Sequence, residues 1–300
     1  MEERNKLISV DIGGSSCKVG LVDARGDVLD FKRFATEDVR AWGPEGFVER
    51  LRPWEENYSV DGVALGVPAM VDWDRNNVRS DCAEVPWIED PANQKVLQDE
   101  LNRPLLLVND VEALLVGEWF WGELKGLDTG VVLSLGTSMG SALLWNETPQ
   151  QGRRGSIMDL EHLSLDTYGR EEGSFPPGSG SQWLSGAGLK QRMHNADEII
   201  PLSEFFTTDE EVYVDLRETF EDKLAHLIGT IVVMLDPERI VLAGGLTKSE
   251  DVWLPPVEEK METFIPDEFT GVPSLTLAQL RHEDVAKGPA AFWDWTRGDG

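Results

Sequence analysis

The feature that most constrains the fold is an abrupt change of hydrophobic pattern within residues 105–122, which read LLLVNDVEALLVGEWFWG. Leu105–Val108 form a continuous apolar run that predicts a buried strand, whereas the apolar positions of 111–121 recur with a helical period. The strand therefore passes into a helix at Asn109 and Asp110. Open α/β sheets bind ligands beyond the carboxyl ends of their strands, and a helix N-terminus favours negative charge. Asp110 is thus our candidate for the chemistry, and helix capping by Asn109 and Asp110 is the alternative interpretation.

The net charge of the chain limits its partners. The 300 residues are enough for two domains, and the formal charge is −28. A surface of this charge repels nucleic-acid and polyphosphate backbones, and the longest basic run we find is the pair Arg153-Arg154. We therefore expect no nucleic-acid partner.

The cysteines and the apolar runs indicate a compartment. Cys17 and Cys82 have neither metal-ligand spacing nor the pattern of a disulfide framework, which fits a reducing environment. No apolar run approaches the roughly 20 residues of a membrane span, and we recognise no signal peptide. The sequence predicts a cytoplasmic protein that does not interact with membranes.

Residues 7–34 predict two strands joined by a tight glycine turn and followed by a third strand. The turn contains Gly13 and Gly14 followed by Ser15, so it exposes backbone N–H groups and a hydroxyl that can cradle a phosphate. Asp11 lies at the end of the first strand, where a carboxylate can hold Mg²⁺. A plain hairpin with a capping aspartate remains the alternative.

Residues 130–145 repeat this design with an apolar strand, a turn of small residues and a second apolar strand. Thr137 and Ser138 offer hydroxyls in the turn, while Gly136 and Gly140 allow a close approach to the backbone. Two hairpins of the same kind suggest a duplicated fold that holds a nucleotide between its halves.

Two further groups of polar residues are candidates for ligand contacts. Asp159, Glu161 and His162 precede a predicted strand, and two carboxylates with an imidazole are well suited to bonding sugar hydroxyls. Glu84 lies in a polar segment with Trp87, which we interpret as a core residue at the base of a loop.

The remaining segments complete an α/β pattern. Helices are predicted over 36–55 with a break at Gly43-Pro44, and over 91–101, 212–235 and 288–295. Residues 168–188 are rich in Gly, Ser and Pro and predict a surface loop, either a lid or a connection. Gly244 and Gly245 follow a strand at 239–242, where they either form a tight turn or let adenosine lie close to the backbone.

Six motifs in this order resemble the ROK family of sugar kinases and related repressors: residues 11–23, 66–72, 108–118, 133–143, 159–163 and 235–246. The resemblance spans nearly the whole chain. It implies a duplicated actin-like ATPase fold of the α/β, ribonuclease H-like class, with two lobes around a central cleft. We expect a smaller domain over 1–113 with the helix 286–300 packed back on it, and a larger domain over 114–285.

The resemblance also implies an activity, in which ATP phosphorylates a hexose hydroxyl, with glucose to glucose 6-phosphate as the favoured reaction. Asp110 would be the general base, and Asp11 would orient Mg²⁺. The implied sugar contacts are Asn109, Asp110, Asp159, His162 and, more weakly, Glu84. The implied phosphate contacts are Gly13, Gly14, Ser15, Lys18, Gly136, Thr137, Ser138 and Gly140. The implied adenosine contacts are Gly244 and Gly245.

Departures from the family pattern leave alternatives open. No cysteine follows Cys82, so the family's zinc motif is missing and we expect no structural zinc. Asp159 and Glu161 stand where the family has Glu and Gly, and Ser138 replaces a common Gly. These features are most similar to the polyphosphate-dependent glucokinase branch, which makes polyphosphate an alternative donor to ATP. A non-catalytic sugar sensor is a second alternative, although the first strand begins by Leu7 and disfavours a DNA-binding role. The expected assembly is a homodimer.

Overall fold

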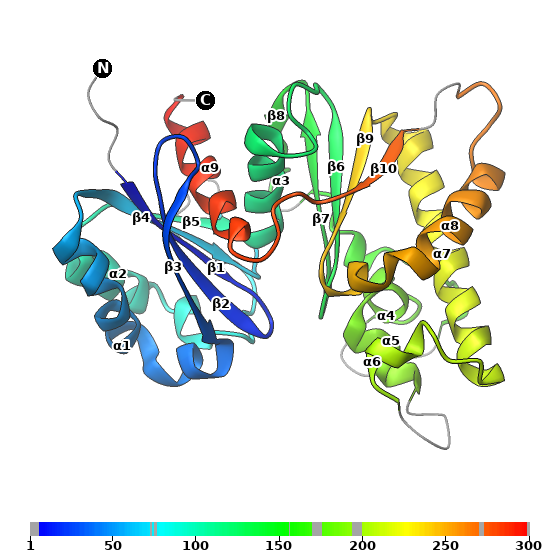
Figure 1. Ribbon diagram of the computed structural model, residues 1–300, viewed down its shortest axis with the longest axis horizontal. Coiled ribbons are helices and arrows are strands. Elements are labelled where there is room, and N and C mark those ends of the chain that lie inside the picture. Colours follow the sequence, from blue (N-terminus) through cyan, green and yellow to red (C-terminus); the bar gives the residue numbers. More distant parts are fainter. Residues whose placement is uncertain are drawn as a thin grey trace. The chain divides into compact units, whose positions relative to one another are not determined.

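The computed structural model describes residues 6–72, 74, 77–155, 157–169, 176–193, 200–269 and 273–298. Its strands form two five-stranded sheets, in the orders β3-β2-β1-β4-β5 and β10-β9-β6-β7-β8 (Figure 1). The chain divides into two compact units, the first comprising residues 1–127, 142–157 and 278–300 and the second comprising 128–141 and 158–277. The mixed α/β architecture predicted from the sequence is confirmed.

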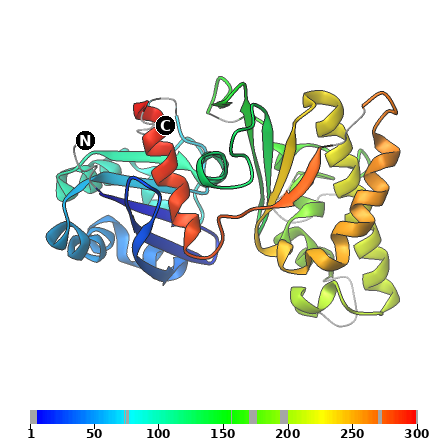
Figure 2. The same ribbon diagram turned by 45° about the horizontal axis from the view of Figure 1, so that its top comes forward.

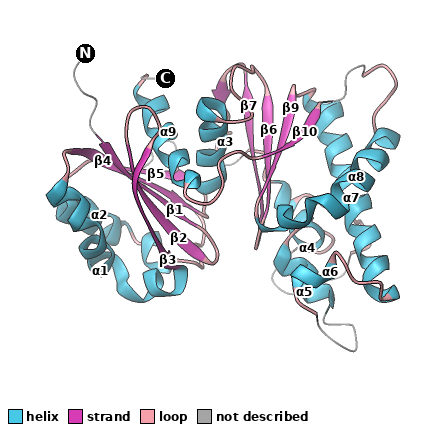
Figure 3. Ribbon diagram, viewed as in Figure 1, coloured by secondary structure: helices cyan, strands magenta, loops and turns pink. Residues whose placement is uncertain are grey.

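The strands and helices are drawn by type in Figure 3. The strands are β1 (Lys6–Ile12), β2 (Ser16–Val22), β3 (Val28–Ala35), β4 (Val60–Val67), β5 (Leu105–Asn109), β6 (Gly130–Leu135), β7 (Met139–Trp145), β8 (Thr148–Pro149), β9 (Arg239–Ala243) and β10 (Ser274–Leu277). The α-helices are α1 (Thr36–Asn57), α2 (Pro91–Leu101), α3 (Asp110–Trp121), α4 (Gly180–Leu184), α5 (Gly186–Met193), α6 (Leu202–Phe205), α7 (Glu211–Leu235), α8 (Glu250–Met261) and α9 (Lys287–Arg297). Short 3₁₀ helices include Pro86–Glu89, Leu160–His162 and Gly245–Ser249.

The first sheet is covered by helices on both faces because its inner strands β1 and β4 are apolar on both sides. Alternate residues of β1 and β4, such as Ile8 and Val63, pack in one core with residues of α1 and α2. The residues between them, such as Leu7 and Ala64, pack with Trp293 of α9. Figure 2 shows α9 lying along this sheet beside α3.

Parallel pairing brings three strand ends to one edge of the first sheet. β1 pairs in parallel with β4, and β4 with β5, with Asp11 opposite Gly66 and Val67 opposite Asn109. The loops that follow these strands therefore leave from the same edge, which is where α/β sheets place ligand-binding groups.

The second unit has its own core between helices and sheet. The long helix α7 buries a stripe of apolar residues that includes Leu224, Leu227 and Ile228. Phe220 of the same helix contacts Phe206 and Trp253 edge to face. Among the described residues, no helix is both long and apolar enough to cross a membrane.

The structure confirms one sequence-based prediction of local structure and corrects two others. Helix α1 does break at Gly43, whose φ of 66° lies outside the helical region. The predicted loop over 168–188 is wrong in its second half, because α4 begins at Gly180 and α5 at Gly186, while 170–175 fall outside the described residues. Residues 163–165 form no strand after His162, only an isolated bridge between Ser164 and Ser179.

Candidate functional site

The junction of β5 and α3 is held by Asn109. Its side-chain oxygen accepts hydrogen bonds from the N–H groups of Val111 (3.0 Å) and Glu112 (3.1 Å), and its amide nitrogen donates to the carbonyl of Ala69 (3.3 Å). Asn109 is therefore the N-cap of α3. The capping interpretation thus applies to Asn109, whereas the Asp110 side chain accepts from the adjacent Val111 N–H at 3.0 Å.

Asp110 lies in an environment that disfavours its charged form. Burial, followed by the negative charges of Asp11 and Glu84, raises the pKa of Asp110 from its ordinary value of 3.8 to about 8, against a smaller opposing effect of the Val111 N–H. A carboxylate with this pKa binds a proton far more strongly than an exposed aspartate. Asp110 therefore has the proton affinity that a general base needs near neutral pH.

Asp11 is paired with a residue of the neighbouring strand. It is 7% exposed, and its Oδ2 atom lies 2.7 Å from Lys18 Nζ, directly across the β1–β2 hairpin. The structure thus joins Asp11, the predicted magnesium ligand, to Lys18, predicted to contact phosphate. Carboxylate oxygen is the ligand type that Mg²⁺ prefers, so the donor atoms of Asp11 fit this ion.

The turn of the first hairpin is exposed and fixed at its base. Gly14 and Ser15 are exposed at its tip, and the Gly13 N–H donates to the Ser16 carbonyl at 3.1 Å. The hydroxyl of Thr36, the first residue of α1, donates to the Gly13 carbonyl at 2.6 Å. The backbone at the tip is therefore presented to solvent by a turn that two neighbouring elements hold in place.

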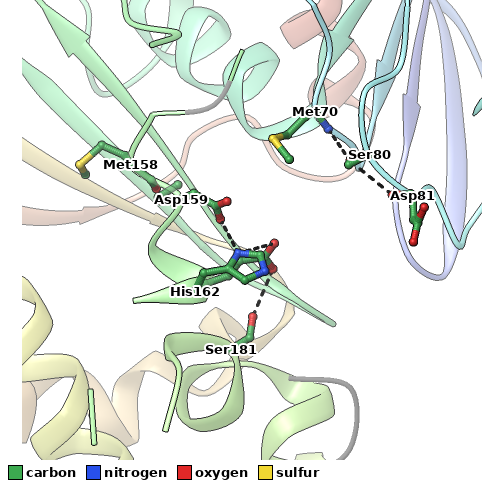
Figure 4. Close-up of polar contacts among 9 residues, drawn as sticks. Met70, Ser80, Asp81, Met158, Asp159, His162 and Ser181 are labelled. Carbon is green, nitrogen blue, oxygen red and sulfur yellow. Dashed lines mark hydrogen bonds and ion pairs between the residues drawn. The ribbon is translucent and has the colours of Figure 1, made fainter. Parts of the chain in front are cut away.

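Glu84 belongs to a loop that is held by long-range contacts. The guanidinium of Arg40 on α1 donates to the carbonyls of Ala83 (2.6 Å) and Glu84 (3.0 Å). Before this loop, the Met70 N–H donates to Ser80 Oγ at 3.0 Å (Figure 4). Arg40 was not predicted from the sequence, because a bond across 44 residues leaves no local pattern.

Asp159, Glu161 and His162 form one cluster in the second unit. Figure 4 shows Asp159 beside His162. His162 Nδ1 lies 3.0 Å from Asp159 Oδ1 and 3.6 Å from Glu161 Oε1, and Ser181 of α4 donates to Glu161 Oε2 at 3.3 Å. The bond to Asp159 raises the pKa of His162, and burial followed by the charge of Asp159 raises the pKa of Glu161.

The chemistry of this cluster is that of hydrogen bonding to a polar ligand. Its carboxylate and imidazole atoms lie within 4.8 Å of one another, and the side chains are partly or largely exposed. Glu161 belongs to the group predicted for ligand contacts, although the family resemblance did not include it among the sugar contacts. Its link to Ser181 joins this cluster to α4, at a distance of 20 residues along the chain.

The second hairpin turn, between β6 and β7, resembles the first in its exposure. Thr137 and Ser138 are exposed at the tip, and the Gly136 N–H donates to the Ser138 carbonyl at 3.0 Å. The first N–H groups of α5, those of Gly186 and Ala187, donate to the carbonyls of Gly136 (2.8 Å) and Thr137 (3.0 Å). Gly140 follows in β7.

Gly244 and Gly245 have different reasons to be glycine. Gly244 has φ of +91°, and a Cβ there would lie 2.5 Å from the backbone of Leu135, so the turn itself requires glycine. A Cβ on Gly245 would meet nothing within 4 Å. The tight-turn interpretation therefore accounts for Gly244, and open space beside the backbone is available at Gly245.

The predicted site residues fall into two sets, one in each unit. The first unit holds Asp11, Gly13, Gly14, Ser15, Lys18, Glu84, Asn109 and Asp110, and the second holds Gly136, Thr137, Ser138, Gly140, Asp159, His162, Gly244 and Gly245. Within the first unit, direct contacts and charge interactions join Lys18, Asp11, Asp110 and Glu84.

Comparison with known sequences identifies a family. The sequence model of the ROK family matches residues 7–295. A glucokinase of Thermotoga maritima is 23% identical over 309 residues, covering 96% of each chain. An N-acetyl-D-glucosamine kinase of Pectobacterium atrosepticum is 24% identical over 296 residues, covering 92% of this chain and 94% of the relative.

Solved structures share the fold. A ROK family glucokinase from Streptomyces griseus, in complex with glucose and AMPPNP, aligns with a TM-score of 0.79 at 23% identity, covering 96% of this chain and 98% of the other. A ROK family transcriptional regulator homologous to the E. coli MLC protein has a TM-score of 0.79 at 18% identity, covering 96% and 78% of the two chains. An inorganic polyphosphate/ATP-glucomannokinase from Arthrobacter sp. strain KM has a TM-score of 0.65 at 22% identity, covering 98% and 99%. The fold that these proteins share is the actin-like ATPase fold expected from the sequence.

Proposed function

The chain belongs to the ROK family, and from this premise we propose that it is a sugar kinase in which Asp110 is the general base. The proposed reaction transfers the γ-phosphoryl group of ATP to a hexose hydroxyl, with glucose as the first candidate acceptor. Glucokinases and N-acetyl-D-glucosamine kinases among the relatives support a hexose as the substrate class.

The observation that carries this proposal is the state of Asp110. Its carboxylate lies at the carboxyl end of β5, follows the residue that caps α3, and has a pKa of about 8. In the proposed step the sugar hydroxyl oxygen attacks the γ-phosphorus, Asp110 takes the hydroxyl proton, and the bond from the γ-phosphorus to the bridging oxygen breaks to release ADP. Phosphoryl transfer depends mainly on positioning and on electrostatic stabilisation, and a base of this pKa can hold the proton.

The other site residues would bind and orient the two substrates. Sugar hydroxyls would bond to Asn109, Asp159 and His162, with Glu84 as a further contact. The donor phosphates would contact the exposed hairpin turns and Lys18, and adenosine would lie beside Gly245, where the backbone is open. Asp11 would hold Mg²⁺, which when bound stabilises the negative charge of the transferring phosphoryl group.

The donor has two candidates. The AMPPNP complex of the Streptomyces griseus glucokinase supports ATP, while the Arthrobacter enzyme supports polyphosphate as an alternative. A long polyanion needs a basic track for binding, and a chain with a formal charge of −28 is poorly suited to supply one. We therefore propose ATP.

A non-catalytic sugar sensor is the second candidate function. The likeness to a ROK transcriptional regulator supports it, because that fold occurs in proteins that are not kinases. The raised pKa of Asp110 and the Asp11–Lys18 pair favour the kinase, since sugar binding alone needs neither.

The experiment is a panel of hexoses and amino sugars incubated with ATP or with polyphosphate, with Mg²⁺ present and the sugar phosphate measured by a coupled assay. The proposal predicts a phosphorylated hexose with ATP. Formation of the sugar phosphate with polyphosphate but not with ATP would refute ATP as the donor. Sugar binding in calorimetry, without product from either donor, would replace the kinase with the sensor.

A further inference from the structure

A buried glutamate outside the site residues lies near the other end of the helix that carries Asp110. Glu118 is on α3, eight residues after Asp110 and thus about 12 Å further along the helix axis, and its side chain is 0% exposed. A fully buried carboxylate needs hydrogen-bond partners, because an unsatisfied one is costly. Its partners show what it does.

Both carboxylate oxygens of Glu118 accept backbone N–H groups from segments far apart in the sequence. Oε2 accepts from Glu123 at 2.8 Å, just after α3, and Oε1 accepts from Leu280 at 2.7 Å. The side chain of Gln279 also donates to the carboxylate of Glu123. One carboxylate thus joins α3 to two segments separated by more than 150 residues.

These two segments are places where the chain passes between its compact units. The chain first leaves the first unit after Leu127 and returns to it for the last time at Ala278, two residues before Leu280; the other two passages lie at 141/142 and 157/158. On the other side of the first passage, Glu238 of the second unit accepts the N–H groups of Asp128 (2.7 Å) and Thr129 (2.9 Å).

The residues between these two carboxylates are suited to bending. Gly126 has a φ of +76°, and a Cβ there would meet nothing within 4 Å. Residues 125–127 therefore lie between a segment fixed by Glu118 and a segment fixed by Glu238, and contain a glycine in the left-handed region.

We propose that Glu118 is a positioning residue for phosphoryl transfer, which fastens to α3 two of the four segments by which the chain passes between its units, the first at Glu123 and the last at Leu280. This inference rests on the proposed kinase function. At these two passages, bending of the chain during the reaction is then confined to residues beyond the bonds to Glu118, and the helix that begins with Asp110 keeps its position in the first unit. Loss of the anchor should affect the chemical step far more than the binding of the sugar.

The test is Glu118→Gln, which keeps the side-chain volume but presents an NH₂ group to one of the two N–H donors. We expect kcat to fall by about tenfold or more, because displacements of about 1 Å in an active site cost up to about 10²-fold. The Kd for the sugar, measured by calorimetry without donor, should stay within about twofold. Glu221→Gln is the matched control, since Glu221 is also a buried helical glutamate but bonds Lys260 within the second unit.

Three results overturn the inference. One is a Glu118→Gln enzyme with wild-type kcat per folded molecule and only a lower Tm. Another is an equal loss of kcat in Glu221→Gln. The third, which serves if Glu118→Gln fails to fold, is wild-type kcat in a folded Glu118→Asp variant, whose shorter side chain withdraws the carboxylate from the N–H groups of Glu123 and Leu280. If the wild-type protein phosphorylates no sugar, both the proposed function and this inference are refuted. If the wild-type protein is active, each of the three results above refutes the inference alone and leaves the proposed function unaffected.

Discussion

Replacing Asp110 with asparagine should stabilise the protein, and increasingly so as the pH rises. The pKa of Asp110 is about 8 in the folded chain, against 3.8 for an ordinary aspartate. Its folded-state pKa is raised, so the unfolded chain loses this proton first, and ionisation of Asp110 destabilises the fold progressively between about pH 4 and pH 8. Asparagine is nearly the same size and does not ionise.

The magnitude follows from the pKa difference. Each pKa unit corresponds to about 1.4 kcal/mol, so the difference of about 4 units sets a ceiling of about 6 kcal/mol above pH 8. Asp110 retains some exposure to solvent, and relaxation around the charge reduces the penalty. We therefore expect Asp110→Asn to gain about 2–3 kcal/mol at pH 9, or about 5 °C in Tm, and clearly less at pH 6.

The assay is thermal and urea unfolding of wild type and variant at pH 6, 7.5 and 9. Asp81→Asn, a change at an exposed aspartate, is the control variant with which the Asp110→Asn difference at each pH is compared. An Asp110→Asn variant that is no more stable than wild type at pH 9, or whose advantage does not grow between pH 6 and pH 9, would refute the argument that burial and neighbouring carboxylates hold this pKa high.

Three further predictions concern the site. Because the general base must be unprotonated, kcat/KM should rise about tenfold per pH unit below pH 8 and level off above it, and an acidic limb near pH 4 would contradict the pKa of Asp110. Gly245→Ala should raise the KM for ATP but leave Tm unchanged, since a Cβ there meets nothing within 4 Å. Gly244→Ala should lower the free energy of unfolding by about 1–3 kcal/mol, because its φ is positive and a Cβ would clash with the backbone of Leu135. Equal Tm values for the two variants would contradict this distinction. Asn109→Ala should lower stability by about 1 kcal/mol through loss of the N-cap and also weaken sugar binding, and calorimetry showing unchanged sugar affinity would limit Asn109 to capping.

The junction at Asn109 and Asp110 could be predicted from sequence because its signals are local. A continuous apolar run followed by helical periodicity gives a strand and a helix, and the change of period locates the boundary. The two hairpins were equally accessible, since glycine turns between apolar runs define them. The hairpin register that sets Asp11 opposite Lys18 also follows from the position of the turn.

Long-range contacts were beyond such reasoning. The short helices α4 and α5 form in a segment rich in Gly and Ser because side chains there satisfy the backbone: Gln182 accepts the Gly178 N–H, and Ser185 accepts the Gly188 N–H. Tertiary context thus overrides a low helix propensity. Glu118 could be noticed as an acidic residue among the apolar residues of a predicted helix. Its hydrogen bond to Leu280 could not be predicted, because the two residues are 162 positions apart.

The most direct test of the account is to measure phosphoryl transfer to glucose and glucose binding together in Asp110→Asn, with ATP and Mg²⁺ at pH 8. If Asp110 is the general base, kcat falls by about 10²–10⁴-fold while the fold is retained and the sugar still binds. Turnover at the wild-type rate by a folded Asp110→Asn enzyme would remove Asp110 from the mechanism.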